Sequence, residues 1–498
     1  MPKSILTLIF VLWILTGVKA FHAGTTRLSP PQRDAQAMGT GLDVDSWERT
    51  FARQKPKSVL HSGHSSLSAN GVSMAYFEVD VTPPPGSPLA FGTTRMIRDS
   101  LSARGIVLIF DEKPVVLVAI DWIGIANKGM DVFRKALARA VGTSEDRVAI
   151  HALHQHNAVR CDLTTPCILE EFGSSELYYD TAFLYRSIEN VASVAQASLE
   201  NLQPVTDISF GQARVSRVAS NRRILGRHGD VENMRWSWTQ DFRLRHANEG
   251  LIDPFLKMIT LFNGQEPLVS LSYYAVHPVI NFGEGEVSAE FVGIARKYQE
   301  MKRNYPQIYF TGAAGNIGVG KYNNGTDQIR YTFAARLSMA MDEALESAVT
   351  KPLDQTGIKW KTSEVYLPLA DYVNQDSLIQ VITGEKYDPG YPYLRAIAGL
   401  AWWTRVHREP YVRISALHLG GVRLLSLPGE PFVEYQLAAQ RLFPGNMVCT
   451  AAYEEYGMGY IGTRQAYEEG GYETSKMATM VGPEAEVALM KGIREVLE

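Results

Sequence analysis

The chain has 498 residues, of which 45% are hydrophobic and 20% charged, and its formal net charge is −4. A chain of this length and composition can bury a large core, so an ordinary globular protein is expected. Positive charge is neither in excess nor concentrated in one stretch, and we therefore expect no nucleic-acid partner.

The first residues have the pattern of an export signal. Lys3 precedes an apolar run over residues 5–18, and the small residue Ala20 stands before Phe21. This run is shorter than the roughly 20 residues that a membrane-spanning helix needs. We predict a signal peptide over residues 1–20, cleaved after Ala20, and a secreted or periplasmic protein. An uncleaved membrane anchor is the alternative.

Residues 21–70 are rich in Ser, Gly, Gln and charged residues, which predicts a flexible segment. From residue 71 onward, strand-like and helix-like patterns alternate. Apolar runs predict strands over residues 76–82, 105–111, 115–121, 148–150, 268–278, 307–312 and 422–430. Helical spacing predicts helices over residues 131–141, 180–202 and 484–498. We predict a single large mixed α/β domain over residues 71–498, in which buried strands carry metal ligands at their ends.

The chain has three cysteines, and export would bring them into an oxidising compartment. Cys161 and Cys167 are close in sequence, which allows a local disulfide in an oxidising compartment. Such a bond would hold the loop after the histidines described next. Cys449 lies among apolar residues and is expected in the core.

Polar side chains recur where buried strands end. The strand at residues 148–150 is followed by His151, His154 and His156. If this strand continues, His154 and His156 share one face and aim at one point, a geometry that suits Zn²⁺. Histidines satisfied by hydrogen bonds at a strand end are the alternative. Two later strands lead to His277 and, in a Pro-Gly turn, to Glu430.

A glycine-rich segment, residues 312–320, follows another predicted strand and has four glycines in nine residues. Glycines let the backbone bend sharply and approach a ligand closely. The segment lacks the GK[ST] spacing of a phosphate-binding P-loop.

Taken together and in order, several segments resemble the catalytic domain of the neutral, non-lysosomal ceramidases. They are VDVTPPPGSPLAFG at 79–92, the histidines at 154 and 156, SNR at 220–222, VH at 276–277, the glycine-rich segment, PGE at 428–430 and YEEGGYE at 467–473. The resemblance covers roughly residues 74–498. It implies a zinc-dependent amidohydrolase that cleaves a linear amide in an N-acyl, possibly sphingolipid, substrate.

The resemblance also implies roles for individual residues. The zinc ligands carried over from the family are His154, His277, Glu430 and Tyr460. His156 would move a proton or bind the substrate carbonyl, Arg222 would be a fixed cation, and Tyr472 would donate a hydrogen bond to the oxyanion. The alternatives are a solvated Arg222–Arg223 pair and a packing role for Tyr472.

The sequence departs from the family at two places. Gly318 stands where the family has a serine proposed as nucleophile, so an acyl-enzyme cannot form there and zinc-activated water is expected to attack instead. The chain stops at Glu498, where the family continues into an immunoglobulin-like domain. A small N-acyl compound therefore remains an alternative substrate to a two-tailed lipid. For a lipid substrate, we expect peripheral contact with a membrane.

Two other functions stay open at this point. One is a noncatalytic, zinc-stabilised protein that binds a lipid or glycan in the same pocket. The other is a metal-dependent esterase or phosphoesterase. The oligomeric state is not indicated by the sequence.

Overall fold

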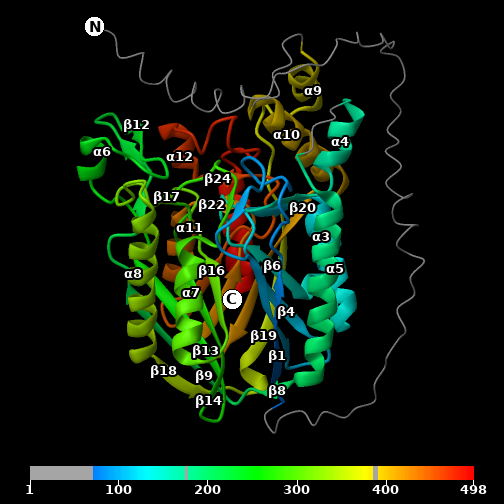
Figure 1. The fold of residues 1–498 in the computed structure, drawn as a ribbon, viewed down its shortest axis with the longest axis vertical. Helices are drawn as coiled ribbons and strands as arrows, with labels where there is room; N and C mark the ends of the chain where they lie inside the picture. Colours follow the sequence, from blue (N-terminus) through cyan, green and yellow to red (C-terminus); the bar gives the residue numbers. More distant parts are fainter. Residues whose placement is uncertain (1–70, 174–177, 385–390) are drawn as a thin grey trace. The chain divides into compact units, whose positions relative to one another are not determined.

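Three mixed β-sheets, each covered by its own helices, form the framework that positions the site (Figure 1). The computed structural model describes residues 71–173, 178–384 and 391–498, which belong to the unit Ser66–Glu498. The predicted signal peptide and the predicted flexible segment lie outside the described residues. The mixed α/β class is confirmed, because helices and strands alternate along the described chain.

The first sheet has the strand order β6-β4-β3-β1-β8. Its strands are β1 (Ser73–Asp80), β3 (Ser102–Ile109), β4 (Val115–Ile120), β6 (Val148–Ala152) and β8 (Gln203–Pro204). The strands predicted over residues 105–111 and 115–121 form the antiparallel pair β3–β4, and β6 runs parallel to β4. Helices α3 (Lys128–Val141) and α5 (Thr181–Ser198) pack on this sheet. Every residue of β4 is buried, which explains its uninterrupted apolar sequence.

The second sheet has the order β16-β14-β13-β9-β18. Its strands are β9 (Asp207–Arg214), β13 (Phe255–Asn263), β14 (Glu266–Tyr274), β16 (Gln307–Thr311) and β18 (Val349–Pro352). Helices α7 (Glu290–Arg303) and α8 (Asp327–Glu346) cover it.

The third sheet has the order β19-β20-β21-β23. Its strands are β19 (Ile358–Tyr366), β20 (Tyr411–Leu419), β21 (Val422–Ser426) and β23 (Met447–Ala451). Helices α11 (Val433–Leu442) and α13 (Ala485–Leu497) pack against it. The predicted C-terminal helix is α13, and its residues Leu489, Ile493 and Val496 are buried.

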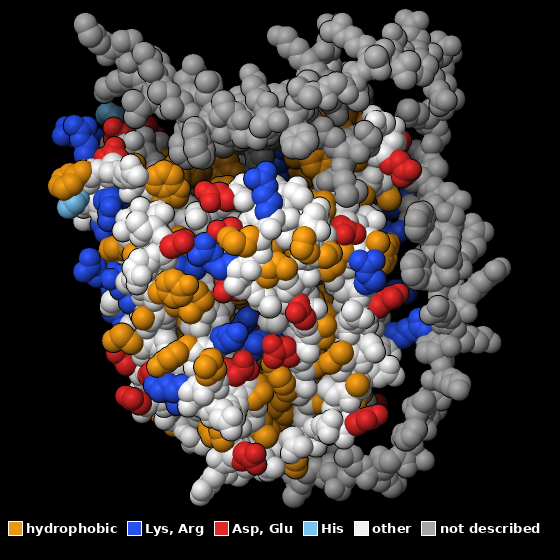
Figure 2. All heavy atoms as spheres, in the orientation of Figure 1, with side chains coloured by type: hydrophobic (Ala, Val, Ile, Leu, Met, Phe, Trp, Pro, Cys, Tyr) orange, Lys and Arg blue, Asp and Glu red, His pale blue; other side chains and the backbone are white. Residues whose placement is uncertain are grey.

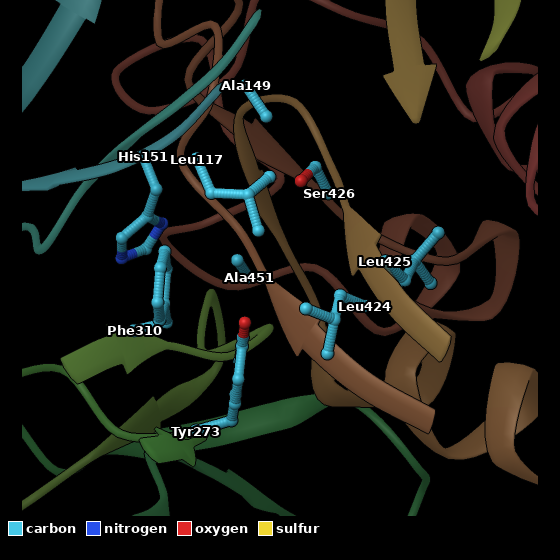
Figure 3. Close-up of a pocket in the computed structure, with 9 residues that line it drawn as sticks. All are labelled: Leu117, Ala149, His151, Tyr273, Phe310, Leu424, Leu425, Ser426 and Ala451. Carbon is cyan, nitrogen blue, oxygen red and sulfur yellow. The ribbon is translucent and has the colours of Figure 1, made fainter. Parts of the chain in front are cut away.

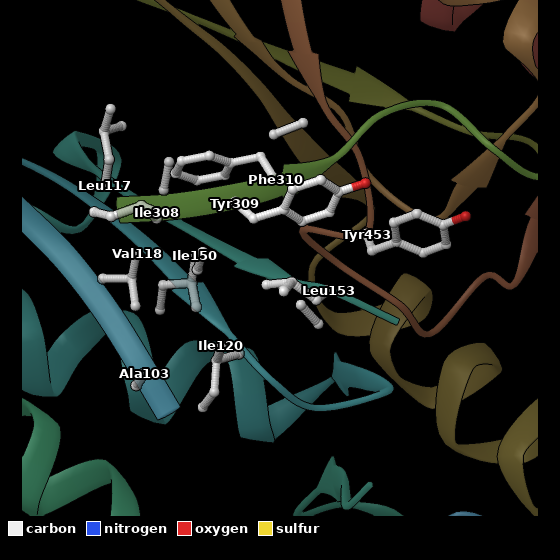
Figure 4. Packing of buried hydrophobic residues seen from close by; sticks show 14 of the residues in the cluster. Ala103, Leu117, Val118, Ile120, Ile150, Leu153, Ile308, Tyr309, Phe310 and Tyr453 are labelled. Atoms are coloured by element: carbon white, nitrogen blue, oxygen red, sulfur yellow. The ribbon is translucent and has the colours of Figure 1, made fainter. Parts of the chain in front are cut away.

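His151 joins the three sheets where their edge strands meet. Its Nδ1 atom donates to the carbonyl of Ala452, just after β23, and its Nε2 atom accepts from the Thr311 N–H at 3.0 Å. Burial lowers the pKa of His151 to about 3, so the imidazole is neutral and both nitrogens are satisfied. The apolar side chains around this junction are shown in Figure 4, and the small internal cavity beside His151 and Phe310 in Figure 3. His151 therefore has a structural role.

The predicted disulfide between Cys161 and Cys167 is wrong, since both thiols are free. Cys161 is buried in β7 (Arg160–Asp162), where its sulfur packs against Gly129 of α3. Cys167 lies in α4 (Thr165–Glu171) and donates to the carbonyl of Leu163, at 3.6 Å. The two cysteines are close in sequence, but their sulfur atoms contact different partners. Cys449 is buried in β23, as predicted.

On the face shown in Figure 2, acidic and basic side chains are interspersed, with apolar side chains between them. None of the helices in the described ranges has the length and hydropathy needed to cross a membrane.

Candidate metal centre

His154 is placed by the turn that follows β6. The strand ends at Ala152, so the prediction that His154 and His156 share a strand face is wrong. His154 has a positive φ of 67°, which turns the chain sharply and which a non-glycine residue rarely adopts. Its N–H donates to the carbonyl of Trp122 at 2.9 Å, and its Nδ1 donates to that of Ile123 at 2.8 Å. These bonds fix the orientation of the imidazole. With the proton of the neutral ring on Nδ1, the Nε2 atom presents its lone pair.

His277 follows β14 and is fixed in the same way. Its Nδ1 atom lies 2.7 Å from the carbonyl oxygen of Ala314 and 3.1 Å from that of Ile317, both in the glycine-rich segment. Burial lowers the pKa of His277 to about 4, which keeps the imidazole neutral. A neutral imidazole whose Nδ1 proton is bonded to a carbonyl has its Nε2 lone pair free for a metal.

Glu430 completes a triangle of ligand atoms. Its Oε2 atom lies 3.2 Å from Nε2 of His154 and 3.2 Å from Nε2 of His277. All three residues are buried, and these three atoms have no hydrogen-bond partner among the residues that the structure describes. Burial raises the pKa of the Glu430 carboxyl, but the two imidazoles lower it further, and it lies well below its ordinary value.

The spacing of these atoms suits a bound cation. Ligands at about 2.0–2.1 Å from a tetrahedral metal are roughly 3.3 Å apart, close to the distances seen here. One nitrogen from each of His154, His156 and His277 also lies within 4.8 Å of the others. Orphaned buried polar atoms are rare because they cost free energy, and a metal ion would satisfy all of them together. These residues could hold a metal ion.

Tyr460 lies beside Glu430 through a short parallel pair of strands, β22 (Glu430–Pro431) and β24 (Tyr460–Ile461). Its ring is parallel to that of His277, with the centroids 6.3 Å apart. The guanidinium of Arg222 lies 5.3 Å from the centre of the Tyr460 ring. The structure therefore brings Tyr460 to the edge of the site.

His156 lies on the outer side of the site, between aromatic rings. It stacks on Phe91 at 5.3 Å and contacts Phe282 edge-on at 5.1 Å. Its ring centre is 5.9 Å from that of His277. Both ring nitrogens are buried and have no hydrogen-bond partner in the described part of the chain. They are thus available to a bound ligand.

Arg222 is buried, so a solvated Arg222–Arg223 pair is excluded. Its Nη2 atom donates to the Gly315 carbonyl at 2.7 Å and lies 3.1 Å from Oε1 of Glu473. Arg223 binds the other oxygen of Glu473 at 3.2 Å. Burial alone would lower the pKa of Arg222, but Tyr460 and Glu473 raise it, and the guanidinium remains charged. Within the described ranges, the Nε atom of Arg222 has no hydrogen-bond partner.

Tyr472 is half-buried at the margin of this group. Its ring contacts Trp236 at 5.3 Å and Tyr460 at 5.9 Å. Tyr472 therefore lies beside the site residues. Its position is compatible both with packing and with a hydrogen bond to a ligand.

Two solved structures are similar to this chain. One is neutral ceramidase from Pseudomonas aeruginosa, with a TM-score of 0.59 and 16% sequence identity over 86% of this chain and 74% of the other. The second is described as ceramidase complexed with C2, with a TM-score of 0.61 and 16% identity over 86% and 75% of the two chains. The chain has a ceramidase-like fold. No protein-family model matches the sequence, and the curated proteins include no match to it.

The position that differs from the ceramidase pattern, Gly318, lies against Arg222. Gly318 is in β17 (Ile317–Gly318), which pairs with β10 (Ser220–Asn221). A Cβ atom at Gly318 would lie 3.1 Å from Cδ and 3.2 Å from Cγ of Arg222. The stem of Arg222 thus fills the space that a side chain at 318 would need.

Two tyrosines beside His154 in this ceramidase-like fold were missed by the sequence reasoning. Tyr453 stacks on His154 with the ring centres 4.4 Å apart, and Tyr456 is tilted against it at 5.5 Å. Gly124 leaves the space that the Tyr456 ring occupies. The available signal was that Tyr453 lies two residues after a buried strand, as His154 does.

Proposed function

We propose that this chain is an exported, zinc-dependent, ceramidase-like hydrolase that cleaves the amide bond of an N-acyl substrate. The observation that carries the proposal is the meeting of two imidazole nitrogens and one carboxylate oxygen, all buried and without hydrogen-bond partners among the described residues. The ceramidase-like fold over 86% of this chain supports the proposal.

Zinc suits this donor set. Two histidines and one glutamate are a frequent catalytic zinc set, and Tyr460 is the proposed fourth ligand. When bound in such a site, zinc lowers the pKa of water toward neutrality and polarises a carbonyl group. The residues that would hold it are His154, His277, Glu430 and Tyr460.

The surrounding side chains supply the remaining functions. His156, whose two ring nitrogens have no hydrogen-bond partner among the described residues, would accept a proton from the attacking water and return it to the leaving amine. The buried Nε–H of Arg222, which has no partner within the described ranges, would donate to the substrate oxygen as negative charge develops there. Tyr472 is proposed as a second donor to the same oxygen.

The substrate is proposed as a small-molecule or lipid N-acyl compound. Gly318 offers no hydroxyl, so hydrolysis would proceed by direct attack of water and without a serine acyl-enzyme. The aromatic side chains of Phe91 and Phe282 beside His156 would contact an apolar acyl group. A lipid substrate would further require transient contact with a membrane surface.

The decisive experiment is turnover of a fluorogenic N-acyl substrate by the purified mature chain. Activity that is lost with a chelator, restored by Zn²⁺ and absent from His154→Ala would support the proposal. Tight zinc binding without turnover would favour a noncatalytic binding protein. Faster turnover of matched ester or phosphoester analogues would favour an esterase or phosphoesterase. Export is tested by N-terminal sequencing of the secreted protein, which should begin at Phe21.

A further inference from the structure

Tyr453 has features that packing alone does not explain. It follows β23 and is fully buried, yet its hydroxyl has no hydrogen-bond partner among the described residues. Its φ is 63°, in the left-handed region that non-glycine residues rarely occupy. A buried unpaired hydroxyl and a strained backbone both cost free energy, and they persist together mainly where a functional arrangement requires them.

The backbone of Tyr453 is tied to the two loops that carry metal-site residues. Its N–H donates to the Gly429 carbonyl at 2.9 Å, directly before Glu430. Its own carbonyl accepts from Ala152 at 3.4 Å, at the end of β6 and two residues before His154. The position of this tyrosine is therefore set by the same segments that position the ligand atoms.

The side chain lies face-on against a metal-site imidazole. The rings of Tyr453 and His154 are 4.4 Å apart and 14° from parallel, and the ring of His277 is 6.0 Å away and perpendicular. In Figure 4 the Tyr453 hydroxyl points away from the apolar side chains of the core. The ring thus restricts rotation of His154, and the hydroxyl is directed out of the apolar cluster.

We propose that Tyr453 is a further positioning and ligand-binding residue of the metal centre. Its ring holds the imidazole plane of His154, and its hydroxyl donates a hydrogen bond to an oxygen atom of a small ligand bound at the centre. The inference rests on the proposed metal site, but it does not depend on the amide-cleaving activity.

Two substitutions separate the ring from the hydroxyl. Tyr453→Leu removes both and is expected to weaken zinc binding by about 10- to 100-fold, the usual effect of losing a group that orients a metal ligand. Tyr453→Phe keeps the stacking and is expected to bind zinc within about threefold of the parent, while acetate binding to the cobalt-loaded protein weakens by about fivefold or more. Zinc affinity is measured by competition with a chromophoric chelator, and acetate binding by the visible cobalt spectrum.

Thermal unfolding of the metal-free protein distinguishes this role from a structural one. Tyr453→Phe removes a buried hydroxyl that has no partner within the described chain. Its thermal midpoint should therefore equal that of the parent or exceed it by up to about 3 °C. Tyr273→Phe is the matched control, since Tyr273 is also buried and stacked, on Phe310 at 4.7 Å, but lies by the internal cavity at His151. It should change neither zinc nor acetate affinity.

Two results would overturn the inference. Parental zinc affinity in Tyr453→Leu would remove the positioning role of the ring. Parental acetate affinity in Tyr453→Phe, together with a lower thermal midpoint, would show that the hydroxyl serves only stability. A protein that shows the expected metal and acetate effects but hydrolyses no N-acyl substrate would refute the proposed function and leave this inference standing.

Discussion

The Nε2 atom of His154 lies 3.2 Å from the Oε2 atom of Glu430, although the two residues follow strands of different sheets. His277, from the remaining sheet, lies at the same distance from this oxygen. Each sheet thus contributes one residue to the centre. The arrangement requires all three sheets to be packed correctly, so metal binding at the proposed centre would report on the whole fold.

Loss of either histidine should abolish stoichiometric metal binding. We expect His154→Ala and His277→Ala to retain well under a tenth of the parental zinc after dialysis, because removal of one of few ligands opens the site. His246→Ala is the control, since His246 is exposed on α6 (Phe242–His246). Metal content is measured by elemental analysis. Zinc retained by both site variants would place the metal elsewhere.

Glu473→Gln should destabilise the protein strongly. Glu473 is buried and neutralises both Arg222 and Arg223. Removing its charge leaves two buried cations without their main partner, at a cost of about 3–5 kcal/mol. Glu469→Gln is the control, because Glu469 is partly exposed, pairs with Arg223 alone and should cost about 1 kcal/mol or less. Denaturant unfolding measures both, and equal effects would contradict the assignment.

Gly318→Ser should lower activity and should not create a nucleophile. Its Cβ would lie 3.1 Å from Cδ of Arg222, so the arginine has to shift from the position in which we propose that it serves the substrate oxygen. We expect kcat/KM to fall about tenfold or more, with no burst of acyl-enzyme in rapid-mixing experiments. Gly445→Ser is the control, since a Cβ at Gly445 meets no atom within 4 Å. A burst with higher activity in Gly318→Ser would refute this reading.

Because of His151, the free energy of unfolding should fall as the pH is lowered below about 6.5. Burial holds its pKa at about 3 in the folded state, against an ordinary histidine pKa of 6.5. Between these values the unfolded chain binds a proton that the folded chain does not, so this histidine lowers stability by about 1.4 kcal/mol per pH unit of acidification.

The test compares the thermal midpoints of the metal-free parent and of His151→Gln between pH 7 and pH 5. The variant should be less stable at pH 7, because a group that joins three sheets is altered, but its midpoint should fall less steeply on acidification. Parallel curves for the two proteins would show that His151 titrates normally in the folded state.

Local sequence patterns determined much of the framework. The runs of buried residues in β4 and β14 and the helical spacing of α5 and α13 are properties of short segments, and the structure has these elements close to the predicted bounds. The recurrence of His154, His277 and Glu430 after buried strands is also local, which is why these candidates could be selected from the sequence.

Other features depended on contacts between distant segments. The turn at His154 breaks the expected strand because its N–H and Nδ1 atoms bond to carbonyls beyond β4. Cys161 and Cys167 have different partners, since Cys161 packs against Gly129 of α3 and Cys167 donates to the carbonyl of Leu163. Arg222 can be buried because it contacts Glu473 and Tyr460. Both residues are distant in the sequence, so no local spacing indicates these contacts.

The sequence by itself thus determined which segments become strands and helices and which polar residues stand at their ends, since periodicity is set by neighbours in the chain. Only the tertiary structure decided which of those ends meet. His154, His277 and Glu430 lie close together, and Tyr453 lies against them, because three sheets pack edge to edge around the hydrogen bonds of His151. That packing is governed by long-range burial and hydrogen bonding, which one-dimensional patterns do not encode.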